Sequence, residues 1–171
     1  MREVYIISGT LGVGKTTCTS ILLDRLNPAS LIRIDDVIIK YEKSNLDWHE
    51  LLALVWSDIL SNIDEPSKFK SSPFIVDCVV DDGEEKYLSE LSKNNTVYYF
   101  QLIADEKTLK SRIESRGDDH MISRQLEVLS LIKNNPIKLT HSLNTTNMSP
   151  EEVASYIVEN KNSFIFKPEV L

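Results

Sequence analysis

The stretch Gly9-Thr10-Leu11-Gly12-Val13-Gly14-Lys15-Thr16 decides the fold of this chain. It matches the pattern G-x-x-x-x-G-K-[ST] at every fixed position. An apolar run at residues 4–8 precedes it, and a helix-like pattern at residues 16–26 follows it. A buried strand, a glycine-rich turn and a helix form the context in which this pattern makes a phosphate-binding loop. The alternative, a fortuitous glycine-rich turn, would not require both neighbours to be in register.

Each residue type in the loop has a chemical reason. Glycines let the backbone turn its N–H groups inward without a clash from Cβ, which makes a nest for phosphate oxygens. The following helix presents its positively polarised N-terminus to the same anion. Lys15 supplies a mobile positive charge at the β- and γ-phosphates, and the Thr16 hydroxyl is a candidate Mg²⁺ ligand. The expected ATP-binding residues of the loop are Gly9, Thr10, Leu11, Gly12, Val13, Gly14, Lys15, Thr16 and Thr17.

Short apolar runs alternate with helix-like segments along the chain. The expected strands cover residues 4–8, 31–34, 74–76, 97–102 and 137–143. The expected helices cover residues 16–26, 47–63, 84–93, 106–116 and 121–133, with a last helix from Ser149-Pro150 onward. Continuous apolar runs are typical of strands covered on both faces, and their alternation with helices predicts right-handed βαβ crossovers. We therefore expect an α/β fold, a three-layer α/β/α sandwich around a five-stranded parallel sheet.

Two of the expected helices carry a start signal. Asp47 with Glu50, and Ser149 with Glu152, have the spacing of a capping box. The apolar positions of the segment 47–63 follow a helical stripe that includes Trp56. This tryptophan is therefore expected in the core.

Composition limits the class of protein. The chain has 171 residues, which is about one domain at roughly 150 residues per domain. Its net charge of −7 argues against a general nucleic-acid surface. Cys18 and Cys78 have no metal-ligand spacing, so we expect two buried thiols in a reducing compartment. No apolar run is long enough for a signal peptide or a membrane span, which predicts a cytoplasmic protein without a membrane partner. The oligomeric state stays open.

Three further stretches, together with the loop, carry a resemblance to a known family. They are Leu31-Ile32-Arg33-Ile34-Asp35-Asp36, Leu109-x-x-Arg112-x-x-x-Arg116, and residues 144–153. Over most of its length the chain resembles the small P-loop kinases: nucleoside-monophosphate, shikimate, gluconate and polynucleotide kinases and their uncharacterised AAA-type ATP-binding relatives. The resemblance implies the strand order 2-3-1-4-5 and one kinase-like domain over residues 1–171. It also implies an acceptor-binding helical segment at 37–72 and a lid-like segment at 106–136.

Asp35 is the candidate group for the acceptor. The resemblance implies that the first Asp of such an acidic pair acts as a base or orients the acceptor hydroxyl. A carboxylate at the carboxyl end of a strand faces the ligand crevice of an open α/β sheet, so this role is chemically reasonable. The alternative is that Asp35 or Asp36 caps the next helix.

Asp77 is a candidate metal ligand. It ends the third apolar run, Phe74-Ile75-Val76-Asp77, in a Walker-B-like position where a carboxylate holds Mg²⁺ directly or through water. Thr16 and Asp77 are therefore the expected metal ligands. The alternatives are a structural role for Asp77, or Asp81 or Asp82 in its place.

Arg112 and Arg116 are spaced so that they share one helix face, one turn apart. The resemblance implies that Arg112 lies against the adenine and can reach phosphate, and that Arg116 contacts the transferring phosphates. Planar guanidinium groups suit stacking and bidentate phosphate contacts, and they stabilise the charge that develops during transfer. Arg124 is a further candidate phosphate contact, and a solvated surface helix is the alternative for this segment. The resemblance also implies that the backbone of residues 144–153 passes close to the adenine.

The acceptor is constrained by what the segment 37–72 contains. It has no arginine, whereas a nucleoside-monophosphate kinase needs arginines there to hold the acceptor phosphate. Trp48 could stack on a planar acceptor, with partly exposed packing as the alternative. This favours a neutral hydroxyl acceptor: a nucleoside, a sugar or an antibiotic-like small molecule.

These features predict an ATP-dependent phosphotransferase that uses Mg²⁺ and moves the γ-phosphoryl group to a hydroxyl of a small molecule. The catalytic candidates are Lys15, Asp35, Arg112 and Arg116. A nucleoside-monophosphate kinase, an ATPase switch and a degenerate nucleotide-binding protein are alternatives. A nucleic-acid 5′-hydroxyl kinase is disfavoured by the net charge and by Ile38, where the polynucleotide-kinase-like pattern has arginine. A GTPase is disfavoured because the chain has no N-K-x-D motif.

Overall fold

Five parallel strands form the sheet at the centre of the molecule, in the order β2-β3-β1-β4-β5. The computed structural model describes residues 1–64, 73–79, 85–135, 138 and 140–168. The strands are β1 (Arg2–Gly9), β2 (Ser30–Arg33), β3 (Phe74–Asp77), β4 (Asn95–Ile103) and β5 (Ser142–Asn144). The strand order expected from the family resemblance is confirmed.

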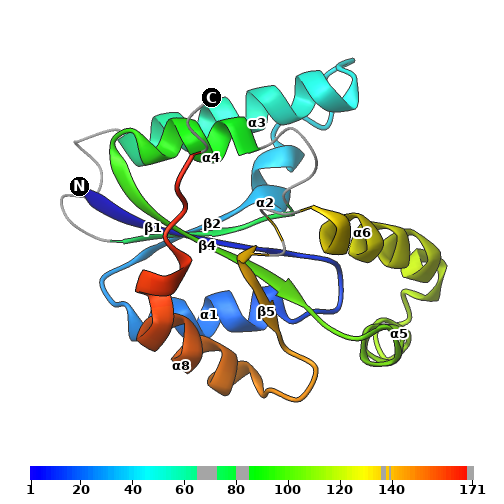
Figure 1. Ribbon diagram of the computed structural model, residues 1–171. Coiled ribbons are helices and arrows are strands. Elements are labelled where there is room, and N and C mark those ends of the chain that lie inside the picture. Colours follow the sequence, from blue (N-terminus) through cyan, green and yellow to red (C-terminus); the bar gives the residue numbers. More distant parts are fainter. Residues whose placement is uncertain (65–72, 80–84, 136–137, 139, 169–171) are drawn as a thin grey trace.

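Helices cover both faces of the sheet, which confirms the three-layer architecture (Figure 1). The helices are α1 (Lys15–Arg25), α2 (Ile34–Ile39), α3 (Trp48–Asp64), α4 (Glu85–Ser92), α5 (Glu106–Glu114), α6 (Ile122–Asn134) and α8 (Pro150–Asn160), with short turns η1 (Asp119–Met121) and η2 (Lys161–Phe164). Helices α1 and α8 lie on one face, and α3 and α4 lie on the other. Helices α5 and α6 lie toward the end of the sheet at which β4 points.

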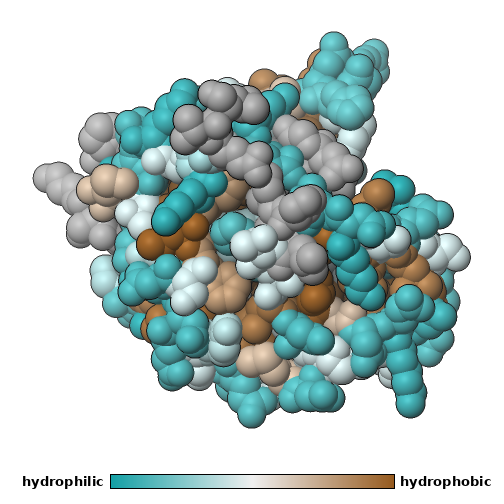
Figure 2. Space-filling view, in the orientation of Figure 1, coloured by the Kyte–Doolittle hydropathy of each residue, from teal (hydrophilic) through white to brown (hydrophobic). Residues whose placement is uncertain are grey.

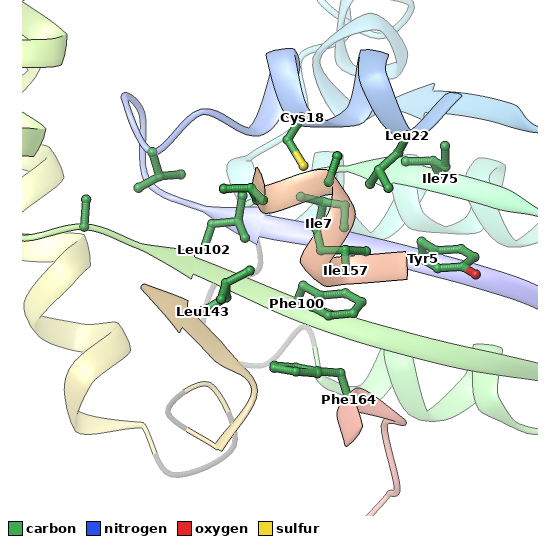
Figure 3. Packing of buried hydrophobic residues seen from close by; sticks show 14 of the residues in the cluster. Tyr5, Ile7, Cys18, Leu22, Ile75, Phe100, Leu102, Leu143, Ile157 and Phe164 are labelled. Carbon is green, nitrogen blue, oxygen red and sulfur yellow. The ribbon is translucent and has the colours of Figure 1, made fainter. Parts of the chain in front are cut away.

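The central strand β1 shows why the apolar runs are continuous. Tyr5 and Ile7 point into a core shared with α1 and α8, where Figure 3 shows them beside Leu22 and Ile157. Val4 and the other alternate positions of this strand pack on the opposite face, against α3 and α4. Both faces of a central parallel strand are buried, so alternation between apolar and polar residues is absent.

Both predicted capping boxes are present. The Glu50 N–H donates to Asp47 Oδ1 at 2.9 Å, and the Asp47 N–H donates to Glu50 Oε2 at 3.1 Å. At the start of α8, Ser149 and Glu152 make the same reciprocal pair. Trp56 of α3 is fully buried, as its place on the apolar stripe predicted.

Two strand predictions extend too far. Ile34 was expected to end a strand but begins α2, because Ile34 and Val37 form the buried side of a short helical turn. Residues 137–143 were expected to be one strand, yet Lys138 and Thr140 have helical backbone and β5 spans only Ser142–Asn144. The reason is local: the Asn135 side chain accepts from the Lys138 N–H at 3.1 Å, the hydrogen bond of a helix N-cap.

Cys18 and Cys78 are both buried, as predicted, and no disulfide joins them.

The C-terminal segment packs on the sheet. Phe164 stacks on Phe100 of β4 with ring centroids 4.5 Å apart, and the Phe166 N–H donates to the Val97 carbonyl oxygen at 2.9 Å. Among the described helices, none is both long enough and apolar enough to cross a membrane.

Candidate active site

The phosphate-binding loop runs from the end of β1 to the start of α1. Gly9, Gly12 and Gly14 all have positive φ, at 146°, 86° and 99°. A Cβ on Gly9 would lie 2.5 Å from the Leu102 carbonyl oxygen, closer than real Cβ atoms approach. The loop therefore requires glycine at Gly9 both for its backbone angles and for its approach to β4. The loop leads into α1, and the first N–H groups of this helix, which have no partner within the helix, are available to an anion.

Lys15 lies folded along this loop. Its Nζ donates to the carbonyl oxygens of Gly9 at 2.7 Å and Thr10 at 3.1 Å. Burial lowers the pKa of the Lys15 ammonium, and the carboxylates of Asp77 and Asp35 oppose that shift. The lysine is thus a partly buried amine at the loop, within the electrostatic reach of both acidic candidates.

Asp77 lies beside the loop at the carboxyl end of β3. The register pairs it with Ile7 of β1 on one side and Arg33 of β2 on the other, so it occupies the middle of the sheet edge. Burial raises the pKa of its carboxyl, and the charge of Lys15 opposes that shift. Thr19 Oγ1 donates to Asp77 Oδ2 at 3.3 Å.

The residues around Asp77 fit Mg²⁺ shared with phosphate. The Thr16 side chain is among the groups that lower the pKa of the Asp77 carboxyl, so these two candidate oxygen ligands lie near each other. Within the part of the chain that the structure describes, no group of three or more His, Cys, Asp or Glu could hold a metal. Mg²⁺ is commonly held by one or two protein oxygens together with waters and substrate phosphates. The alternatives Asp81 and Asp82 lie outside the described residues.

Arg112 joins the loop to the segment after β5. Its Nη2 donates to the Thr145 carbonyl oxygen at 3.1 Å. The Thr145 hydroxyl in turn shares its single proton between two carbonyl oxygens, those of Val13 at 3.2 Å and Ile103 at 3.1 Å. These bonds hold three distant parts of the chain, α5, the loop and the β5–α8 connection, around one space.

That space is a cavity of about 260 Å³ beside the loop. Arg112 and Arg116 both line it, although they do not share a helix face: α5 ends at Glu114, so Arg116 follows the helix instead of lying on it as expected. Thr145, Met148 and Val153 also line it, so the structure brings part of residues 144–153 beside the phosphate-binding loop. A cavity between a phosphate-binding loop, two guanidinium groups and apolar side chains has the chemistry to hold a nucleotide.

A second cavity, of about 330 Å³, lies between α2, α3 and α6. Asp35 of α2, Trp48 of α3 and Arg124 of α6 all line it. Arg124 was expected as a further phosphate contact, but it lines this cavity rather than the one that holds Arg112. Asp35 is exposed in the first turn of α2 and does not end a strand. The N-cap of α2 is Arg33, and no side chain caps this helix, so neither Asp35 nor Asp36 is its N-cap.

Gln125 connects the second cavity to the loop, and it is not among the site residues predicted from the sequence. Its Oε1 accepts from the Leu11 N–H at 2.8 Å, across 114 positions of sequence. Gln125 also lines the cavity that contains Asp35. A glutamine within a helix gives no local signal of such a role. The bond joins the loop amide of Leu11 to a side chain that lines the second cavity.

The fold and the glycine-rich loop define a P-loop protein of the α/β class. A family model described as AAA domain matches residues 6–130, well over half of the chain, and the chain belongs to this family. A search of curated protein sequences finds no significant match.

Three solved structures, two of which are named as kinases, share the fold. A tunicamycin resistance protein from Deinococcus radiodurans has a TM-score of 0.71 and 17% identity, over 98% of this chain and 100% of its own. A gluconokinase from Sinorhizobium meliloti 1021 has a TM-score of 0.63 and 16% identity, over 96% and 93%. A shikimate kinase from Acinetobacter baumannii, in complex with shikimate, has a TM-score of 0.64 and 15% identity, over 98% and 96%. At these identities the likeness is one of fold.

Proposed function

We propose that the protein is an ATP-dependent phosphotransferase that moves the γ-phosphoryl group to a hydroxyl of a small molecule. One observation carries the proposal: the phosphate-binding loop lines the cavity of Arg112 and Arg116, and it is hydrogen-bonded to Gln125, which lines the cavity of Asp35. The Gln125–Leu11 hydrogen bond ties the second cavity to a loop amide. A donor and an acceptor bound in these cavities would meet at the loop, which is what in-line transfer requires.

The roles of the residues follow from their places. The loop amides and Lys15 would neutralise the β- and γ-phosphates, and Arg112 and Arg116 would approach from the lid side. Thr16 and Asp77 would hold Mg²⁺, which would neutralise charge on the phosphate oxygens. Asp35 would orient the acceptor hydroxyl and take its proton.

The same geometry gives a proposed division of the chain 1–171. Within residues 37–72, α3 supplies one wall of the acceptor cavity. Within residues 106–136, α5 supplies Arg112 to the cavity beside the loop, and α6 supplies Arg124 to the acceptor cavity. The acceptor segment and the lid-like segment would thus act on one centre. The kinase-like names of the structural neighbours support this reading.

The test is ADP release from Mg²⁺-ATP with a panel of nucleosides, nucleoside monophosphates, sugars, gluconate, shikimate and short oligonucleotides. We expect one acceptor class to stimulate release and to gain a phosphomonoester signal in ³¹P NMR. Lys15→Ala should abolish the stimulated release, and Lys110→Ala, an exposed lysine on α5 that lines neither cavity, serves as the control. Release that depends on Lys15 but ignores every acceptor would contradict the transfer function and support an ATPase.

A further inference from the structure

We propose that the acceptor is an amphiphilic alcohol, with its reacting hydroxyl at Asp35 and an apolar ring lying along Trp48. This inference rests on the proposed function and names the class of its second substrate. It separates the expected acceptor from free sugars, polyhydroxy acids and nucleotides.

The walls of the acceptor cavity are mainly apolar. Seven of its ten lining residues are apolar, and they come from α2, α3, η1 and α6, with Val79 after β3. Leu52 and Val128 are buried at its base. A free sugar would leave most of its hydroxyls without hydrogen-bond partners against these walls, whereas a ring would bury apolar area.

The apolar surface continues beyond this cavity. A second hollow of about 280 Å³ shares Trp48, Leu52, Arg124 and Val128 with it and extends to Leu131 of α6. Trp48 is 53% exposed and Leu131 is 50% exposed, so both offer apolar surface to a ligand. Figure 2 shows apolar surface in the part of the molecule formed by α6. Together the two hollows form a path from Asp35 outward that suits a body longer than one sugar ring.

The charges in the cavity oppose an anionic acceptor. Asp35 and Arg124 carry opposite charges in the same cavity, so together they contribute no net positive charge. A phosphate dianion would meet the carboxylate of Asp35. Arg124 has a weak ion pair with Glu127, at 3.6 Å with both side chains exposed, so its guanidinium can turn to donate to a neutral oxygen.

The proposed transfer step is balanced. The acceptor hydroxyl oxygen forms a bond to the γ-phosphorus, and the bond from that phosphorus to the β–γ bridging oxygen breaks. ADP leaves, and the hydroxyl proton passes to Asp35. The apolar body of the acceptor takes no part in this step and serves to hold the hydroxyl in place.

The experiment compares matched pairs that share their hydroxyl groups but differ in an apolar ring. The pairs are glucose with phenyl β-D-glucoside, galactose with phenyl β-D-galactoside, and glycerol with 3-phenoxypropane-1,2-diol; gluconate and shikimate serve as polar references. We expect kcat/KM for the aryl member to exceed that of its partner by about tenfold or more. Trp48→Ala should remove most of that preference, and Leu54→Ala, an exposed apolar position of α3 outside both hollows, should keep it.

A binding readout separates the inference from the proposed function. Aryl members should quench tryptophan fluorescence with saturation, and Trp48→Phe should abolish the quenching because Trp56 is fully buried. Saturable quenching without any phosphoryl transfer would refute the proposed function and keep the cavity's preference. Phosphorylation of gluconate, shikimate or a free sugar in preference to the aryl compounds would keep the function and overturn the inference. The absence of both aryl binding and aryl turnover would also overturn the inference.

Discussion

At the scale of single residues, the position of Asp35 makes the sharpest prediction. Asp35 is exposed in the first turn of α2, lines the acceptor cavity and lies within electrostatic reach of Lys15. Asp35→Asn keeps the size of the side chain and removes its basicity, so kcat for transfer to an identified acceptor should fall by about 10²–10⁴-fold. The dissociation constant for nucleotide should change little, because Asp35 does not line the cavity of Arg112.

The chain offers a matched control for this change. Asp36 is the neighbouring residue, equally exposed and in the same helical turn, but it lines neither cavity. Steady-state kinetics of Asp36→Asn should therefore resemble those of the unmodified protein. Equal losses in both variants would point to an effect of α2 as a whole, and full activity of Asp35→Asn would refute its role as base.

At the scale of elements, the start of α3 links helix capping to acceptor binding. The Asp47 side chain caps the helix that presents Trp48 and Leu52 to the cavity. Asp47→Ala should lower the free energy of unfolding by about 1 kcal/mol and fray this first turn. The KM for the acceptor should therefore rise while the nucleotide dissociation constant stays the same.

Asp47→Ser is the control for the capping prediction, because serine caps a helix about as well as aspartate. Urea denaturation measures the stability of both variants, and acceptor and nucleotide titrations measure the two sites separately. A rise in the nucleotide dissociation constant with an unchanged acceptor KM would show that α3 does not shape the acceptor cavity.

At the scale of the whole molecule, nucleotide binding should stabilise the fold. The nucleotide cavity joins the phosphate-binding loop, α5 and the β5–α8 connection, so a ligand there holds together parts distant in sequence. A non-hydrolysable ATP analogue with Mg²⁺, at 100 times its dissociation constant, should add about 2.7 kcal/mol to the free energy of unfolding. For a chain of this length the melting temperature should rise by about 5–10 °C.

Calorimetry or thermal fluorescence measures this shift without any knowledge of the acceptor. Removal of Mg²⁺ with EDTA should shrink the shift, because Thr16 and Asp77 would then lack the ion that joins them to the phosphates. Lys15→Ala should shrink it as well. A shift that survives both changes would mean that the analogue binds outside the phosphate-binding loop.

Local signals explain which parts of the fold were predictable. The glycine-rich loop, the continuous apolar strands and the two capping boxes depend on residues within a few positions of one another, and the structure contains all of them. The two errors are also local. A single buried turn at Ile34 and a side-chain cap at Asn135 turned the backbone to helix where apolar runs predicted strand.

The sequence by itself determined the class of this protein, because a phosphate-binding loop between a buried strand and a helix is encoded in one contiguous stretch. The tertiary structure alone decided how the site is divided. It placed Arg124 in the second cavity with Asp35 and brought Gln125 to the Leu11 N–H. The residues brought together lie about 90 to 114 positions apart, and no period or spacing records which distant side chains meet when a parallel sheet brings the ends of its strands to one edge.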